Sequence, residues 1–205
     1  MPSSRKSAVR ARLRALRRER VPARDRARDA EELALSALEV VYAAGLGRGD
    51  WVAAYEATPL EPPMEAMVDA LSARGIRVMV PVTLENWDLD WREVGSAAGA
   101  AATDMSGTGT LGTETLGTEA IRQAKVVFLP AHGVDPSGTR IGQGKGCYDL
   151  VIPRTSARLV AVVHPWEVLD EELPSEPHDR RVNAVMAAEL GVVEVGRADD
   201  GSARS

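Results

Sequence analysis

The chain has 205 residues, of which 44% are hydrophobic and 27% charged, and its formal net charge is −5 at pH 7. This length suits one α/β domain that buries roughly 70% of the surface its unfolded chain exposes. No apolar run approaches the roughly 18 residues of a membrane span, the arginine-rich start lacks the apolar core of a secretory signal, and the single cysteine excludes an internal disulfide. We therefore expect a cytoplasmic protein without a membrane partner or a structural zinc site.

The N-terminal segment differs in charge from the rest of the chain. Residues 1–28 hold eleven Arg or Lys residues against Glu19 and Asp25, a net charge of +9, which leaves −14 for the remainder. Such a segment could bind nucleic acid, lie on an acidic surface of its own domain, or direct cations at a polyphosphate. It contains no aromatic residue that could stack on bases, so a nucleic-acid partner is not expected.

Helical spacing predicts a docked amphipathic helix in this segment, with Ser4 as its N-cap. One side carries four residues at spacings of three and four, and a cationic row lies beside it. The first set is Val9, Leu13, Leu16 and Arg20, and the cationic row is Lys6, Arg10 and Arg14.

Helices and strands are predicted to alternate in the next part of the chain. A leucine-rich pattern predicts a helix over about 23–44, and residues 51–55 predict a strand. Glu61, followed by two prolines, is expected to open another helix that ends near Gly75, because proline is tolerated in a first helical turn. Residues 76–82 then predict a buried strand.

Residues 83–94 predict an exposed-edge strand with Trp87, Leu89 and Trp91 on one face. The two tryptophans could contact a ligand, but packing in the core is the favoured role. Residues 95–118 consist mainly of Gly, Ala, Ser and Thr, and predict a long loop.

The C-terminal part continues the alternation. It predicts a strand at 126–129, a short helix at 148–152, a strand at 158–163 and a turn of helix at 167–171, with a disordered tail at 197–205.

This alternation predicts an α/β fold, with a mostly parallel sheet and helices on both faces, in one domain over residues 1–196. In such folds the ligand site lies at the carboxyl ends of the strands. Loops that follow strands are therefore the first places to look for chemistry.

One of these loops combines three glycines with two cations. Gly142, Gly144 and Gly146 let the backbone approach an anion closely, and Arg140 and Lys145 add positive charge. The spacing fits neither the P-loop nor the G-x-G-x-x-G fingerprint. We interpret the segment as an unrelated phosphate loop, and the alternative is a glycine-rich turn with a solvated lysine.

Four segments occur in the order typical of one family, and the long glycine motif is the most specific of them. They are Lys6-x-x-Val9-Arg10, the Glu61 helix start, Asp135-x-x-Gly138-x-Arg140-Ile-Gly-x-Gly144-x-Gly146-x-Tyr148-Asp149, and Glu176-x-His178-Asp179-x-x-Val182. Over roughly residues 5–195 the chain resembles the 5-formyltetrahydrofolate cyclo-ligase family.

The resemblance implies a three-layer α/β/α fold with a mostly parallel sheet, of the type seen in the cyclo-ligase and CoA transferase-like group. It also implies ATP- and Mg²⁺-dependent conversion of 5-formyltetrahydrofolate to 5,10-methenyltetrahydrofolate, with release of ADP and phosphate. The formyl oxygen would be phosphorylated and then displaced as phosphate when the ring closes. Such a phosphoryl transfer needs mainly in-line alignment and cations.

The resemblance further implies a nucleotide site built from the N-terminal helix and the glycine loop. The residues implied to bind ATP are Lys6, Arg10, Arg140, Gly142, Gln143, Gly144, Lys145, Gly146, Cys147 and Tyr148. Lys145, Tyr148 and Arg140 form the implied catalytic set. In this set Lys145 would neutralise the transferring phosphoryl group and Tyr148 would face both ligands.

Glu61, together with Tyr148, is implied to bind the folate, and Asp149 and Asn183 are implied Mg²⁺ ligands. The residues alone leave other roles open. Asp149 could cap the short helix after the loop, and Glu61 could stabilise the start of its own helix.

Three positions depart from the family's usual pattern. Cys147 stands in place of an aromatic residue, Leu150 in place of an arginine, and Asn183 in place of an aspartate, so Asn183 brings no negative charge to a metal. They motivate one alternative, a diverged paralogue that binds ATP but acts on another substrate. A separate alternative is a non-catalytic protein that binds folate or uses its basic helix on nucleic acid. His178 is expected to order loop backbone, and the sequence indicates no oligomeric state.

Overall fold

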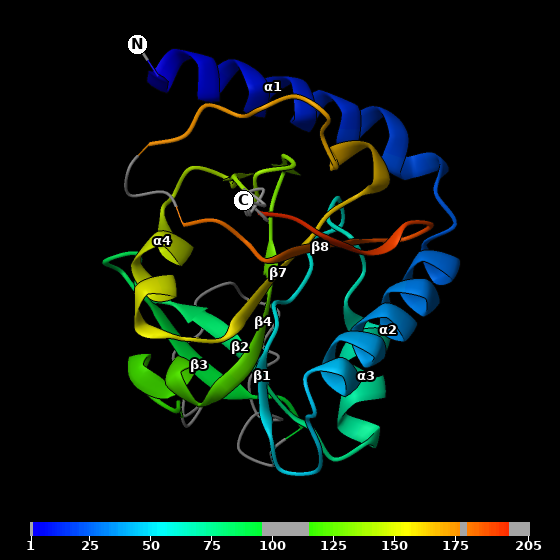
Figure 1. Cartoon of the computed structure of the whole chain (residues 1–205), viewed down its shortest axis with the longest axis vertical. Helices are drawn as coiled ribbons and strands as arrows, with labels where there is room; N and C mark the ends of the chain where they lie inside the picture. The colour runs from blue at the N-terminus through cyan, green and yellow to red at the C-terminus, as the bar shows by residue number, and fades with distance from the viewer. Residues whose placement is uncertain (1, 96–114, 177–179, 197–205) are drawn as a thin grey trace, which may run out of the picture.

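A computed structural model of the protein describes residues 2–95, 115–176 and 180–196. The strands of its main sheet are β1 (Trp51–Ala53), β2 (Arg77–Thr83), β3 (Leu89–Glu93), β4 (Ala124–Pro130), β7 (Arg158–Val162), β8 (Ala184–Ala187) and β9 (Gly191–Glu194). They are ordered β3-β2-β1-β4-β7-β8-β9 (Figure 1). The central strands are parallel, and the edge strands β3 and β9 are antiparallel to their neighbours.

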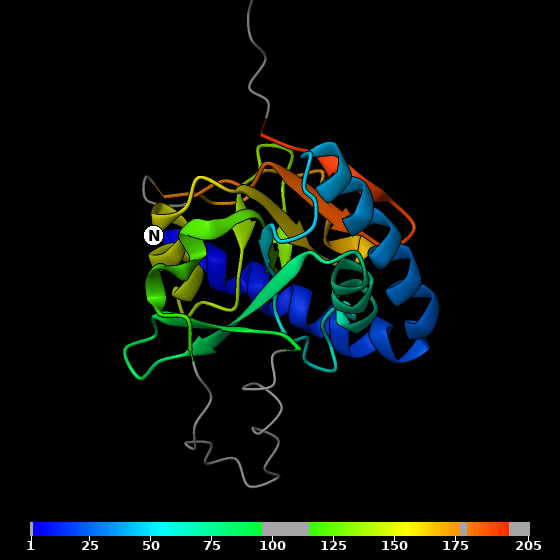
Figure 2. The same cartoon turned by 90° about the horizontal axis from the view of Figure 1, so that it is seen from below.

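Helices cover both faces of this sheet (Figure 2). One face carries α2 (Arg26–Ala43) and α3 (Glu65–Ala73). The other carries the short helices η2 (Thr118–Gln123), α4 (Cys147–Val151) and η3 (Ile152–Arg154). Among the described residues, no helix is long and apolar enough to cross a membrane.

Neighbouring residues on the central strands contribute to opposite faces, as the two-residue period of a strand requires. Val52 and Phe128 belong to the buried cluster beneath α2 and α3, while Ala53 and Leu129 belong to the cluster on the other face. The predicted three-layer α/β/α fold with a mostly parallel sheet is therefore confirmed.

The first helix, α1 (Pro2–Arg20), lies across the carboxyl ends of the parallel strands rather than on a face of the sheet (Figure 1). Its Leu13 is fully buried, and it packs in a small separate cluster with Ile141, Leu169 and Leu173. The helix thus closes the edge of the sheet at which α/β folds bind ligands.

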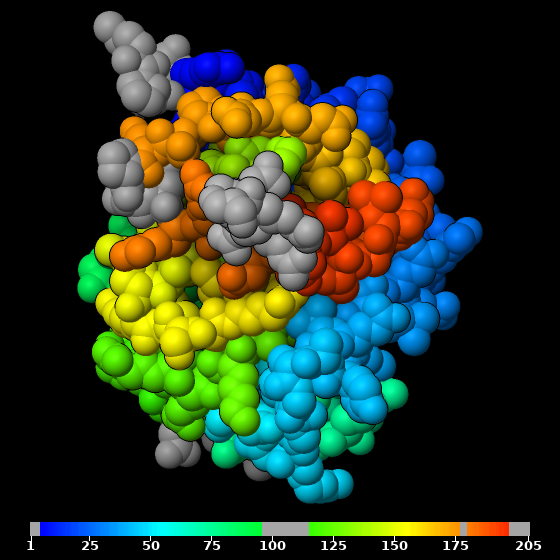
Figure 3. All heavy atoms as spheres, in the orientation of Figure 1, coloured from blue at the N-terminus to red at the C-terminus, as the bar shows by residue number. Residues whose placement is uncertain are grey.

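A buried ion pair fixes α1 in this place. The Arg17 guanidinium donates to both carboxylate oxygens of Glu167, at 2.6 and 2.9 Å, and to the carbonyl of Ala131 at 2.6 Å. Glu167 ends the short helix η4 (Pro165–Glu167), and it also accepts from the backbone N–H of His164. Figure 3 shows α1 against the chain segment that follows β7, so this pair joins two segments far apart in sequence.

Two buried histidines lie beside this ion pair. His132 follows β4, and His164 donates from Nε2 to the carbonyl of Leu60 at 3.1 Å and stacks on Trp166. Burial, followed by the charges of nearby arginines that include Arg17, lowers the pKa of each from 6.5 to about 4. Both rings are therefore neutral at pH 7.

The predicted N-terminal helix is confirmed, but two of its details are wrong. The helix begins at Pro2, so Ser4 lies within it and is not its N-cap. Arg20 is exposed, and Arg17 occupies the buried position instead. Arg17 is the buried arginine because the buried carboxylate of Glu167 lies opposite it. Helical periodicity within 1–20 cannot reveal a partner that lies so far away in the sequence.

The predicted strands at 51–55, 76–82, 126–129 and 158–163 and the helix at 23–44 correspond to observed elements, with small shifts at their ends. The helix predicted from Glu61 begins only at Glu65, and Glu61 lies in the loop before it. The turn of helix expected at 167–171 is instead η4, which ends at Glu167.

The edge strand is confirmed, but only Leu89 and Trp91 point into the core; Trp87 lies before the strand with 47% of its surface exposed. Strands β8 and β9 are not predicted, because an apolar run as short as 184–187 does not distinguish strand from helix. The predicted loop at 95–118 and the predicted tail at 197–205 lie almost entirely outside the described residues.

Replacement of Arg17 by Met should lower the free energy of unfolding by about 3–5 kcal/mol, because it leaves the Glu167 carboxylate buried without its partner. Urea denaturation measures the loss. Arg18→Met, which changes an exposed arginine of the same helix, should alter stability by less than about 0.5 kcal/mol. The double change Arg17→Met with Glu167→Leu should recover much of the loss, and equal instability of the double variant would contradict this role.

The two histidines should make stability depend on pH. Their pKa is depressed in the fold, so the unfolded chain binds protons first as pH falls below about 6.5, and stability is lost progressively toward pH 4. The urea midpoint should therefore drop between pH 7 and pH 5. His132→Asn and His164→Asn should each flatten this dependence, and parallel pH profiles for wild type and both variants would refute it.

Candidate functional site

A cavity of about 510 Å³ lies beneath α1 at the carboxyl ends of the strands. It brings together every sequence-predicted site residue except Asn183. The predicted residues that line it are Lys6, Arg10, Glu61, Arg140, Gly142, Gln143, Gly144, Lys145, Gly146, Cys147, Tyr148 and Asp149. Segments that lie far apart in the sequence, from Lys6 to Asp149, thus form one site.

A tight hairpin presents the glycine loop to this cavity. Its strands are β5 (Gly133–Val134) and β6 (Arg140–Ile141). The buried Asp135 carboxylate accepts from the backbone N–H of Thr139 at 2.9 Å and of Leu173 at 2.8 Å. At Gly138, with φ +81°, a Cβ would lie 2.5 Å from the Val182 carbonyl. Asp135 and Gly138 of the long motif therefore shape the loop and do not face the cavity.

Cations of α1 hold the loop from above. Arg10 donates from Nε to the carbonyl of Gly142 at 3.1 Å, and Arg14 donates to the carbonyl of Gln143 at 2.9 Å. Lys6 is buried and forms an ion pair with Glu176 at 3.1 Å. The cationic row predicted from helical spacing therefore faces the loop and the cavity.

Glu61 is the most buried carboxylate that lines the cavity, with 4% of its surface exposed. One oxygen accepts from the N–H and the hydroxyl of Thr58, both at 2.9 Å, and the other accepts from Gln143 Nε2 at 3.2 Å. Because α3 begins four residues later, Glu61 does not stabilise a first helical turn, and that alternative is wrong.

Two tyrosine hydroxyls lie buried near this carboxylate. The hydroxyls of Tyr55 and Tyr148 have no hydrogen-bond partner among the described residues. Burial first, and the charge of Glu61 second, raises the pKa of both phenols above the ordinary value. Both therefore stay protonated, and each can donate a hydrogen bond to a ligand.

Arg140 and Asp149 neutralise each other beside the glycine loop. Arg140 Nη2 donates to Asp149 Oδ1 at 2.6 Å, and Nη1 donates to the carbonyl of Arg180 at 3.2 Å. Helix α4 has Gly146 at its N-cap position, without a side-chain cap. The alternative in which Asp149 caps this helix is therefore wrong.

Asn183 lies elsewhere. Its Oδ1 accepts from the N–H of Leu159 at 2.8 Å and its own N–H donates to the Leu159 carbonyl at 2.9 Å, so it joins β7 to the start of β8. The structure does not bring Asn183 together with Asp149. Within the described ranges no group of three or more His, Cys, Asp or Glu residues could hold a metal; His178 lies outside them.

One carboxylate is nevertheless compatible with Mg²⁺, which proteins commonly hold through one or two carboxylates together with phosphates of the substrate. Asp149 is the predicted ligand that fits, since it lines the cavity next to the glycine loop and is 40% exposed at its side chain.

The lining residues that sequence reasoning missed include Tyr55, Thr58 and His132. Each follows a parallel strand, β1 or β4. Their position after the carboxyl end of a predicted strand was therefore the available signal for a place in the site. His132 Nδ1 is buried without a hydrogen-bond partner among the described residues. The neutral His132 ring is thus a polar group close to Arg10 and Arg14 of the cationic row.

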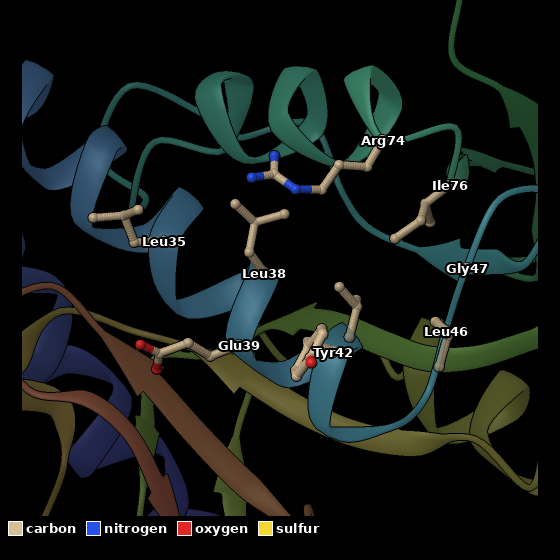
Figure 4. Close-up of a pocket in the computed structure, with 9 residues that line it drawn as sticks. Leu35, Leu38, Glu39, Tyr42, Leu46, Gly47, Arg74 and Ile76 are labelled. Atoms are coloured by element: carbon tan, nitrogen blue, oxygen red, sulfur yellow. The ribbon is translucent and has the colours of Figure 1, made fainter.

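A second pocket, of about 450 Å³, lies between α2 and α3 (Figure 4). Its walls are mainly apolar, with Leu38 and the 86% exposed Tyr42 from α2 and Ile76, which directly precedes β2. No predicted site residue lines it.

Comparisons with known proteins identify a family. The chain matches the model of the 5-formyltetrahydrofolate cyclo-ligase family over residues 2–188. A 5-formyltetrahydrofolate cyclo-ligase from Mycolicibacterium smegmatis is 34% identical over 152 residues, which cover 71% of this chain and 77% of that relative.

Two solved structures are similar in fold. A 5,10-methenyltetrahydrofolate synthetase from Mycoplasma pneumoniae has a TM-score of 0.65 and 14% identity, covering 88% of this chain and 96% of its own. One from Aquifex aeolicus has a TM-score of 0.66 and 20% identity, covering 98% and 95%. With the family match spanning most of the sequence, the chain belongs to the 5-formyltetrahydrofolate cyclo-ligase family.

Proposed function

We propose that this protein converts 5-formyltetrahydrofolate to 5,10-methenyltetrahydrofolate with ATP and Mg²⁺, releasing ADP and phosphate. The observation that carries the proposal is a single cavity, in a member of this family, lined by two kinds of residue. Cations and a glycine loop suit a polyphosphate, and a buried carboxylate with two phenols suits a polar heterocycle.

The folate would bind at Glu61. A buried carboxylate can accept from ring and amino N–H groups of a pterin, and the Thr58 contacts hold it in a fixed orientation. Tyr55 and Tyr148 would donate to acceptors of the same ligand. Their burial keeps water from competing for these hydrogen bonds.

The nucleotide would bind between α1 and the glycine loop, where Lys6, Arg10, Arg140 and Lys145 line the cavity. ATP would supply the phosphoryl group that converts the formyl oxygen into a phosphate leaving group. Lys145 would neutralise the charge that develops on that group, and Arg140 would hold it in line with the formyl oxygen.

The Arg140–Asp149 ion pair would exchange partners when the ligands bind. Asp149 would release Arg140 to a phosphate and accept Mg²⁺ in its place, so neither charge is left without a partner. Mg²⁺, when bound, would neutralise charge on the phosphates. The side-chain exposure of Asp149 makes this exchange possible without unfolding of α4.

The nucleic-acid alternative has less support, because the basic helix uses its charges within its own domain. Besides Lys6 and Arg17, Arg12 pairs with Glu171 at 2.6 Å. The diverged-paralogue alternative retains one favourable observation, since Cys147 lines the cavity.

The proposal predicts a rise at the methenyl-folate absorbance band when the protein meets 5-formyltetrahydrofolate, Mg²⁺ and ATP, and none without ATP. Lys145→Ala should lower kcat by about 10²–10³-fold while the KM for folate changes little, because its charge acts mainly on the transition state. Lys125→Ala is the matched control, since Lys125 lies on β4, is exposed and pairs with Asp50. ATP binding without any absorbance rise in the wild type would favour the paralogue.

The metal assignment predicts that Asp149→Asn raises the Mg²⁺ concentration for half-maximal rate about tenfold or more, because the neutral amide attracts the cation less. Asn183→Asp should leave this concentration unchanged, since residue 183 bonds to Leu159 within the sheet. A lowered Mg²⁺ requirement in Asn183→Asp would instead place residue 183 at the metal.

A further inference from the structure

Trp87 occupies an unusual position in the turn between β2 and β3. Its φ is +66°, and among the described non-glycine residues only Glu189 shares this sign. The turn is closed by hydrogen bonds from Trp87 N–H to the Leu84 carbonyl at 3.0 Å and from Leu84 N–H to the Asp88 carbonyl at 2.9 Å. A large residue in this conformation is strained, and burial does not compensate because nearly half of its surface is exposed.

The turn is tied to the element that follows the glycine loop. Asp88 accepts from both terminal nitrogens of Arg154, at 2.9 and 2.8 Å, and Arg154 ends η3, directly after α4. This bidentate pair fixes the turn against the α4–η3 segment. Trp87 is thereby held at a set distance from the loop that precedes α4.

Lys145 is the loop residue that meets Trp87. Its ammonium lies 4.5 Å from the centroid of the indole ring. Gly144 and Gly146 on either side of it have φ values of +99° and +77°, which glycine adopts readily and other residues rarely do. Within the described part of the chain, the contact that orders this cation is an aromatic face and not a carboxylate.

We propose that Trp87 is a positioning residue for Lys145, holding its ammonium at the mouth of the cavity before the ligands bind. This inference rests on the role proposed above for Lys145. A carboxylate partner would neutralise the lysine and would have to be displaced by the phosphates. An aromatic face instead limits the side chain's freedom and leaves its full charge available to a phosphoryl oxygen.

The first test does not depend on activity. Lysines occur at positions 6, 125 and 145, so their ε-methylene signals can be assigned by single substitutions. Ring-current shielding by Trp87 should shift the Lys145 signal upfield in the ligand-free protein, and Trp87→Leu should remove the shift. An unshifted Lys145 signal in the wild type would overturn the proposal, whatever reaction the protein catalyses.

The second test is a double-mutant cycle of Trp87→Leu and Lys145→Met, read as kcat/KM for ATP. Trp87→Leu alone should lower this value roughly two- to fivefold, the range expected for an exposed cation–π contact. In the Lys145→Met background it should have no further effect, and Trp87→Phe should retain most of the wild-type value.

Tyr42→Leu is the control, because Tyr42 is an exposed aromatic residue in the pocket between α2 and α3, away from the predicted site residues (Figure 4). Equal losses from Trp87→Leu with and without Lys145 would show a merely structural role and refute the proposal. So would a loss in Trp87→Phe as large as in Trp87→Leu. A wild type with no ATP-dependent folate conversion would refute the proposed function, and the NMR result would still decide the Trp87–Lys145 contact.

Discussion

The buried pair of Arg17 and Glu167 determines where the site forms. Each group alone would be costly to bury, but together they lie at hydrogen-bond distance and Arg17 also binds the Ala131 carbonyl. Ala131 immediately follows β4, so one guanidinium connects α1, the end of a central strand and the segment after β7. The roof of the cavity is therefore held by polar contacts, while Leu13 and its apolar neighbours add packing.

The proposed nucleotide site is not built like a P-loop. In a P-loop the cradle comes from one continuous segment, with the lysine inside it. Here the glycine loop supplies backbone, and much of the positive charge comes from a helix about 130 residues earlier, through Lys6 and Arg10. The carbonyls of Gly142 and Gln143 accept from Arg10 and Arg14, so loop and helix order each other before any ligand binds.

Local sequence carried the prediction of most strands, the main helices and the glycine loop, because each depends on a periodicity or on the conformational freedom of glycine. Prediction from local sequence failed where a contact with a distant residue determines the position of a side chain. Arg17 rather than Arg20 is buried because Glu167 lies opposite it, and Asn183 joins the sheet because Leu159 offers it two backbone groups. Tyr55 and His132 enter the cavity only through the strand order, which a single sequence does not specify.

Because the proposed nucleotide site is assembled from distant segments, local opening of one segment would weaken it. Local opening that releases α1 removes Lys6 and Arg10 together, whereas the two apolar clusters of the sheet contain no residue of α1. Glu61 accepts from Thr58, and Tyr148 packs on one of the clusters of the sheet, so these contacts do not involve α1. Weakening of the α1 interface should therefore reduce affinity for a polyphosphate before it reduces affinity for a heterocycle bound at Glu61, and well before the domain unfolds.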